Sequence, residues 1–168
     1  DSFKALPNCA VVLTIDDGWY GTYLHMLPVL EKLEFPATIY VSTYYCENQV
    51  PVYDVVLQYV LTQSSCIEFD IGLLEGQKSK ALNLADKDQK EYASSLLANL
   101  LKGLKNDQAR QEKMEEIGDA LGVSYRDIRE RKLFHLMTME QIGEIDRRGI
   151  DVQLHTHRHR ISYDGQDC

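Results

Sequence analysis

Residues 9–18 read CAVVLTIDDG, an apolar run that ends in two carboxylates and a glycine. The β-rich composition of residues 9–15 predicts a short buried strand. Asp16 and Asp17 follow at its carboxyl end, and Gly18 lets the chain turn there. Because of that turn, both carboxylates can reach one cavity in different roles. This stretch therefore predicts the first strand of a sheet and one part of a site.

A helix and a second strand follow. Leucines recur every three residues from Leu24 to Leu33, which predicts a helix over residues 23–33. Pro28 lies within this span, so the helix should start near Pro28 or be kinked there. Pro36 then introduces a second strand over residues 37–42. The strand–helix–strand order predicts an α/β fold with a parallel sheet and helices outside it.

A third strand is expected over residues 150–154, and the string HTHRH follows it at residues 155–159. Before it, Thr138 and Gln141 have the spacing of a capping box, and Gly149 should end the helix that they begin. Both polar motifs thus follow strands directly. In parallel α/β folds that edge of the sheet is where sites are built.

The middle of the chain has a different pattern. Apolar residues at helical spacing predict helices around residues 55–60, 92–104 and 114–121, and residues 67–73 are a weak strand candidate. We therefore interpret residues 44–133 as a mostly helical insertion in a single domain that covers residues 1–168.

A carboxylate and two neutral imidazoles form a typical three-ligand zinc site with one open position. The pair His155 and His159 suits such a site, and we expect His157 beside it or exposed to solvent. A second carboxylate is left to act as a base, which fits hydrolysis by a metal-activated water. His25 and His135 have no partner visible in the sequence and are expected at the surface or in the core.

Each motif alone has a plainer interpretation. Asp-Asp-Gly is commonly a simple turn, and a histidine-rich string can be a solvated loop. Both motifs occur in this chain, each at the end of a predicted strand and with helices between them. This combination favours a functional site.

The amino-acid composition argues against some classes of binding partner. The net charge of −8 argues against nucleic acid and anionic membranes, both of which favour clustered Lys and Arg. No apolar stretch is long enough to span a bilayer. A secretion signal is either absent or already removed, so the sequence does not determine the cellular compartment of the protein.

At these residues the chain resembles the polysaccharide deacetylase family. Residues 14–18, TIDDG, are similar to the family's T-F-D-D-G motif, and residues 155–159 to its H-[S/T]-x-x-H motif. Residues 35–41, FPATIYV, resemble the second strand. The resemblance covers roughly residues 9–43 and 134–162. It implies a distorted (β/α) barrel and a hydrolase of the carbohydrate esterase kind.

The resemblance also implies roles for single residues. Asp16 would be the general base, and Asp17, His155 and His159 would bind a divalent metal, Zn²⁺ first, with Co²⁺, Ni²⁺ or Mn²⁺ as alternatives. The substrate would be an acetylated oligo- or polysaccharide, carrying N-acetyl or sometimes O-acetyl groups. Trp19 follows Asp-Asp-Gly and could stack on a sugar or simply pack.

The chain departs from the family after His159. The family's later motifs carry a base-orienting Arg, an oxyanion segment and a general-acid His, and the nine residues 160–168 match none of them. We therefore expect an incomplete barrel, because three strands cannot close one. A remaining segment or a second chain would complete it. The alternatives are a noncatalytic metal- or glycan-binding remnant and a metallohydrolase of another amide.

Overall fold

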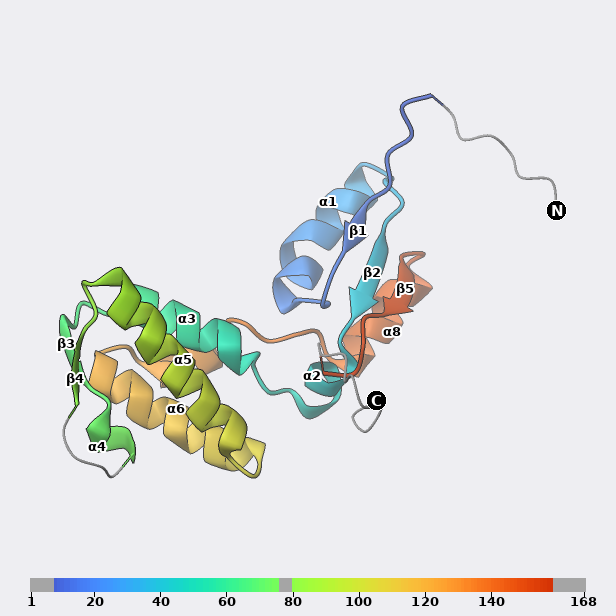
Figure 1. The fold of residues 1–168 in the computed structure, drawn as a ribbon. Coiled ribbons are helices and arrows are strands. Elements are labelled where there is room, and N and C mark those ends of the chain that lie inside the picture. The colour runs from blue at the N-terminus through green and yellow to red at the C-terminus, as the bar shows by residue number, and fades with distance from the viewer. Residues whose placement is uncertain (1–7, 76–79, 159–168) are drawn as a thin grey trace, which may run out of the picture. The chain divides into compact units, whose positions relative to one another are not determined.

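The computed structural model describes residues 8–75 and 80–158 (Figure 1). The chain divides into two compact units. One unit combines Asp1–Gln49 with His135–Cys168, and the other is Val50–Phe134. The first unit contains both polar motifs that the sequence singles out, and the second contains most of the expected insertion.

The first unit contains a parallel sheet in the order β1-β2-β5. Its strands are β1 (Thr14–Ile15), β2 (Thr38–Val41) and β5 (Asp151–Leu154), and β2 lies between the other two (Figure 1). Thr14 is in register with Thr38, and Ile39 with Val152. The predicted parallel α/β arrangement is confirmed. Within residues 8–75 and 80–158 this sheet is open, so no closed barrel is seen there.

The first strand is shorter than expected. Strand β1 has only two residues, and the preceding Val11 and Val12 are 83% and 80% exposed. The prediction of a buried strand over residues 9–15 is therefore wrong: only Thr14–Ile15 form a strand, with Thr14 exposed and Ile15 partly buried. An apolar, β-branched run forms a buried strand only where a partner strand and a packed layer meet it, and here the ladder of β1 with β2 begins at Thr14.

Helices follow β1 and β2 and precede β5. After β1 come the π-helical turn η1 (Thr22–Met26) and helix α1 (Leu27–Lys32). Pro28 occupies the first turn of α1, where its missing N–H is tolerated, and the wider π turn lies directly before it. The expected irregularity near Pro28 is thus a change of helix type. Helix α2 (Thr43–Asn48) follows β2.

Helix α8 (Met139–Arg147) precedes β5 and begins with the predicted capping box. The Gln141 N–H donates to Thr138 Oγ1 at 3.1 Å, and the Thr138 N–H donates to Gln141 Oε1 at 2.9 Å. Gly149 has a φ of +88°, as a glycine that ends a helix should. The signals that place this helix are all local in sequence.

The second unit is mainly helical. It contains α3 (Tyr53–Gln63), α4 (Gly72–Glu75), α5 (Lys87–Gly103), α6 (Asp107–Leu121) and α7 (Tyr125–Glu130). Strands β3 (Glu68–Asp70) and β4 (Ala81–Asn83) pair antiparallel in a sheet of their own. The sequence indicated helices at α3, α5 and α6 and a strand at β3, but not β4, α4 or α7. Helix α4 begins at Gly72, within the strand candidate 67–73, of which only Glu68–Asp70 form a strand. The unit begins at Val50 and not at residue 44, because α2 belongs to the first unit.

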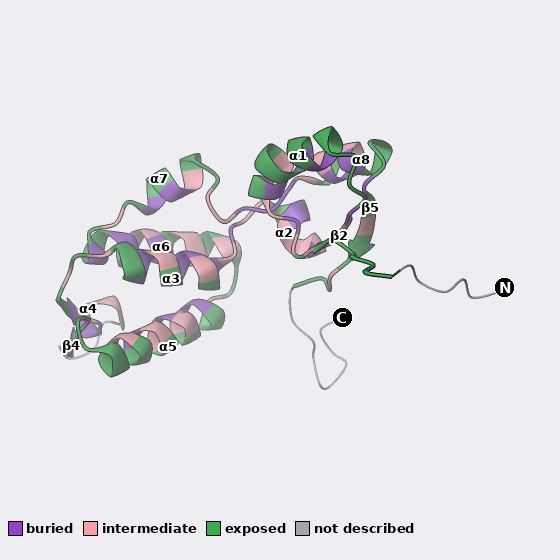
Figure 2. Cartoon of the chain, turned by 90° about the horizontal axis from the view of Figure 1, so that it is seen from above, coloured by how far each residue is buried: buried purple, intermediate pink, exposed green. Residues whose placement is uncertain are grey.

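The core of the second unit lies among α3, α5 and α6. Leu97 and Leu101 of α5 are buried with Met114, Ile117 and their neighbours, and Figure 2 shows buried segments of these helices in purple. The expected stripe of α5 therefore faces a local core. Leu104 packs against the edge of this core and is only partly buried.

Candidate functional site

The turn after β1 is fixed by two residues in the left-handed region. Asp17 has a φ of 69° and Gly18 a φ of 79°, and the Gly18 N–H donates to the Asp16 carbonyl at 2.9 Å. A Cβ on Gly18 would lie 2.9 Å from Val41 Cγ1. Glycine is therefore required both by its φ and by the close approach of β2. Asp17 adopts a conformation that is uncommon for a non-glycine residue, and such residues gather at functional sites.

The chain turns again after β5. The His155 N–H donates to the Val41 carbonyl at 2.9 Å and so extends the ladder with β2 by one residue. Thr156 then has a φ of 65°, which ends the extended conformation. The hydrogen bond to β2 thus fixes the backbone of His155, and this residue lies at the carboxyl end of the sheet.

The two turns bring Asp17 and His155 together across 138 positions of sequence. Asp17 Oδ1 lies 3.6 Å from His155 Nε2, and this oxygen is shielded from solvent. The side chains are 19% and 33% exposed, so the pair is reachable but largely enclosed. At 3.6 Å the two atoms are too far apart for a direct hydrogen bond of normal length.

That spacing fits two ligands of one metal ion. With bonds of about 2.0–2.1 Å to nitrogen and about 2.0–2.2 Å to oxygen, neighbouring donor atoms of a tetrahedral zinc site lie roughly 3.3–3.5 Å apart. The observed 3.6 Å is close to that range. A carboxylate and an imidazole are also donors that zinc prefers. The separation of these two donor atoms is therefore compatible with two ligands of one divalent metal ion.

The remaining candidate residues lie as follows. Asp16 is exposed, directly before the turn. Trp19 is half-buried, and its backbone forms an isolated antiparallel bridge with Leu136. His159 lies outside the described residues. Within residues 8–75 and 80–158 no group of three His, Cys, Asp or Glu side chains could hold a metal ion.

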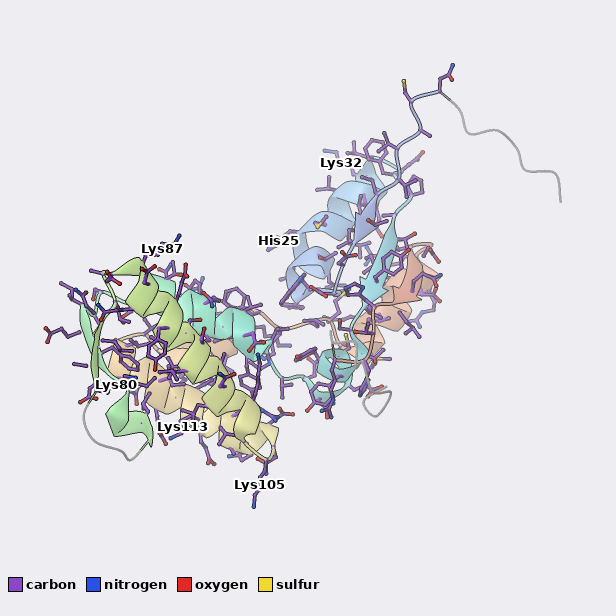
Figure 3. All side chains as sticks on the ribbon, viewed as in Figure 1. His25, Lys32, Lys80, Lys87, Lys105 and Lys113 are labelled. Carbon is purple, nitrogen blue, oxygen red and sulfur yellow. The ribbon has the colours of Figure 1, made fainter. Side chains whose placement is uncertain are left out.

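The other histidines follow the sequence expectation. His157 is exposed, and its Nδ1 lies 2.8 Å from Thr43 Oγ1. His25 is exposed on η1 (Figure 3), and His135 is buried at 8% exposure.

Sequence reasoning missed the contribution of the corner between β2 and α2. Ser42 and Thr43 both contact the loop that follows β5, through hydrogen bonds to His155 and His157. The signal was available, because these polar residues directly follow the second predicted strand at the same edge of the sheet. The sequence prediction places Ser42 at the end of the second strand and Thr43 between that strand and the insertion, and gives neither residue a role.

No helix in the part of the chain that the structure describes is both long and apolar enough to cross a membrane. Comparison with curated proteins and with solved structures returned no match. The family model described as polysaccharide deacetylase matches residues 4–166, almost the whole sequence and not only its two ends. The resemblance carried by the TIDDG and HTHRH strings is therefore confirmed, and the chain belongs to the polysaccharide deacetylase family.

Proposed function

We propose that this protein is a metal-dependent hydrolase that removes acetyl groups from N-acetylated, or O-acetylated, glycans. Membership of the polysaccharide deacetylase family supports deacetylation by a carbohydrate esterase. The observation that carries the metal dependence is the placement of Asp17 Oδ1 3.6 Å from His155 Nε2. The carboxyl ends of β1 and β5, on either side of the central strand β2, supply this pair, at the edge of the sheet where α/β enzymes place their chemistry.

In this proposal Asp17, His155 and His159 hold one divalent ion, most simply Zn²⁺, with Co²⁺, Ni²⁺ or Mn²⁺ as alternatives. A metal bound there would polarise the acetyl carbonyl and lower the pKa of a water. The imidazoles must be neutral and the carboxylate ionised to bind it, so binding should weaken at acidic pH.

Asp16 is proposed as the general base. It directly precedes Asp17 and is exposed, so its carboxylate is open to solvent and can accept the proton of an attacking water. Trp19 is proposed to line the sugar site, and its half-buried side chain leaves a part of the indole accessible for stacking.

We further propose that β1, β2 and β5 belong to a distorted (β/α) barrel, with the unit Val50–Phe134 inserted between β2 and β5. The parallel order of the three strands supports this. So does the 75% exposure of Leu154 at the end of β5, because further strands would cover such a residue.

Titration of two aspartate variants with Zn²⁺ tests the assigned roles. Asp16→Asn should keep the metal affinity and lose about 10²–10⁴-fold in kcat, because asparagine has the shape of aspartate but cannot accept the proton. Asp17→Asn should weaken metal binding first, and excess Zn²⁺ should partly restore its activity, since occupancy follows mass action. Acetate release from chitooligosaccharides is the measurement, with Asp54→Asn on α3 as a matched control.

Rescue of Asp16→Asn but not of Asp17→Asn by added metal would show that the two roles are reversed. Zinc binding with no acetate released from any acetylated glycan would favour a noncatalytic binding protein. Turnover of small amides alone would favour a different metallohydrolase.

A further inference from the structure

Ser42 is the first residue after the central strand β2, and its side chain is buried at 1% exposure. Its neighbours across the sheet are the residues that follow β1 and β5. We propose that Ser42 is a positioning residue, which fixes the backbones of Asp17 and His155 relative to each other. This inference rests on the proposed function, because it concerns the two residues assigned there as ligands.

Two hydrogen bonds carry the proposal. The Ser42 N–H donates to the Asp17 carbonyl at 3.2 Å, and Ser42 Oγ donates to the His155 carbonyl at 3.2 Å. One buried residue is therefore bonded to the main chain of both proposed ligand residues. The first bond needs only a backbone, but the second depends on the hydroxyl.

The hydroxyl of Ser42 does not cap helix α2, although Ser42 is its N-cap residue. Ser42 occupies the N-cap of α2, where a serine side chain commonly accepts a hydrogen bond from an N–H of the first helical turn. In this protein it makes no such bond. A buried hydroxyl needs a partner, and here the partner is the carbonyl of His155.

The first two residues of α2 fasten the same loop at a second point. The Tyr44 N–H donates to the His157 carbonyl at 2.8 Å, and Thr43 Oγ1 lies 2.8 Å from His157 Nδ1. The Tyr44 and His157 rings also meet edge to face, with centroids 5.5 Å apart. The left-handed turn at Thr156 is thus held on both sides, through His155 and His157.

The hydrogen bonds that fix this loop matter because a metal site tolerates little displacement of its ligand atoms. Ligand distances hold within about 0.2 Å, and loss of an outer partner of a ligand typically lowers metal affinity 10- to 100-fold. The backbone of His155 is bonded through its N–H to Val41 and through its carbonyl to Ser42. Loss of the Ser42 hydroxyl would leave only the first of these two bonds.

The test uses three variants of the whole chain. Ser42→Ala removes the hydroxyl, Ser42→Thr retains it, and Ser64→Ala is the matched control. Ser64 Oγ likewise donates to a backbone carbonyl, that of Leu121 at 2.7 Å, but in the second unit. Zn²⁺ affinity is measured by competition with a chromogenic chelator. Residue-resolved amide exchange of His155 and Tyr44 is measured by NMR in the metal-free protein.

We expect Ser42→Ala to weaken Zn²⁺ binding about 10-fold and to accelerate exchange at both amides. Ser42→Thr should restore both values, and Ser64→Ala should change neither. Wild-type Zn²⁺ affinity in Ser42→Ala would overturn the proposal. If Ser42→Ala does not fold, Ser42→Thr becomes the deciding variant. A 10-fold loss of Zn²⁺ affinity in Ser42→Thr would then overturn the proposal.

Failure of the proposed function gives a separate result. If the wild-type protein binds no Zn²⁺, the metal assignment is wrong, and amide exchange alone then decides the role of Ser42. Faster exchange at His155 in Ser42→Ala would support the link between the strand ends, and unchanged exchange would overturn it.

Discussion

Replacement of Gly18 by alanine should destabilise the unit that holds the candidate site by about 2–5 kcal/mol. Two costs contribute to this figure. An L-residue at a φ of +79° loses roughly 1–2 kcal/mol. The new methyl group would lie 2.9 Å from Val41 Cγ1, and relief of such overpacking costs typically about 1–3 kcal/mol.

Two companion variants separate these costs. Gly149 has a φ of +88°, and a Cβ there would meet nothing within 4 Å, so Gly149→Ala should lose only the conformational part, about 1–2 kcal/mol. In a Val41→Ala background the clashing Cγ1 is absent. The cost of Gly18→Ala should therefore fall there to nearly the value for Gly149→Ala, which a double-mutant cycle measures directly.

Urea unfolding followed by tryptophan fluorescence is the assay, because Trp19 is the only tryptophan in the sequence and lies in the same unit. The midpoint should fall with an unchanged slope if only stability changes. A Gly18→Ala loss no larger than that of Gly149→Ala would refute the packing argument. So would an identical Gly18→Ala loss in the wild-type and Val41→Ala backgrounds.

Two predictions concern the second unit. Burial raises the pKa of Tyr125 to about 12 and that of Tyr53 further, so the folded state retains these protons above the unfolded pKa of about 10. Stability should therefore be full below about pH 10 and fall as the pH rises towards 12, and the Tyr53→Phe/Tyr125→Phe double variant should flatten this fall in urea titrations at several pH values. Residues 50–134 expressed alone should fold cooperatively around their own core, and Leu97→Ala should cost them about 2–5 kcal/mol in thermal or urea unfolding followed by circular dichroism. An isolated fragment without a cooperative transition would contradict this independence.

Much of the fold was predictable because its signals are local. The capping box of Thr138 and Gln141, the proline in the first turn of α1 and the apolar stripes of α5 and α6 are patterns within a few residues. Helix and strand periodicities express such patterns directly. Strand β4 and helices α4 and α7 were missed because each is short, and β4 depends on pairing with β3 more than on its own composition.

The limits of sequence reasoning are clearest at the sheet. Residues 9–13 have the composition of a buried strand, yet Val11 and Val12 are exposed. Composition reports what a segment prefers, whereas burial depends on what packs against it. The base role of Asp16 and the ligand role of Asp17 are proposals that the Zn²⁺ titrations above test, and the ligand roles of His155 and His159 are proposals as well.

The sequence by itself determined the family, the parallel order of strand, helix and strand, and the position of both polar motifs at strand ends. Only the tertiary structure decided that Asp17 Oδ1 and His155 Nε2 lie 3.6 Å apart and that Ser42 is bonded to both of their backbones. The physical reason is separation along the chain. A pattern within one turn or strand is set by local sterics, but a contact across more than a hundred residues depends on the left-handed turns at Asp17, Gly18 and Thr156 and on the register of three strands together.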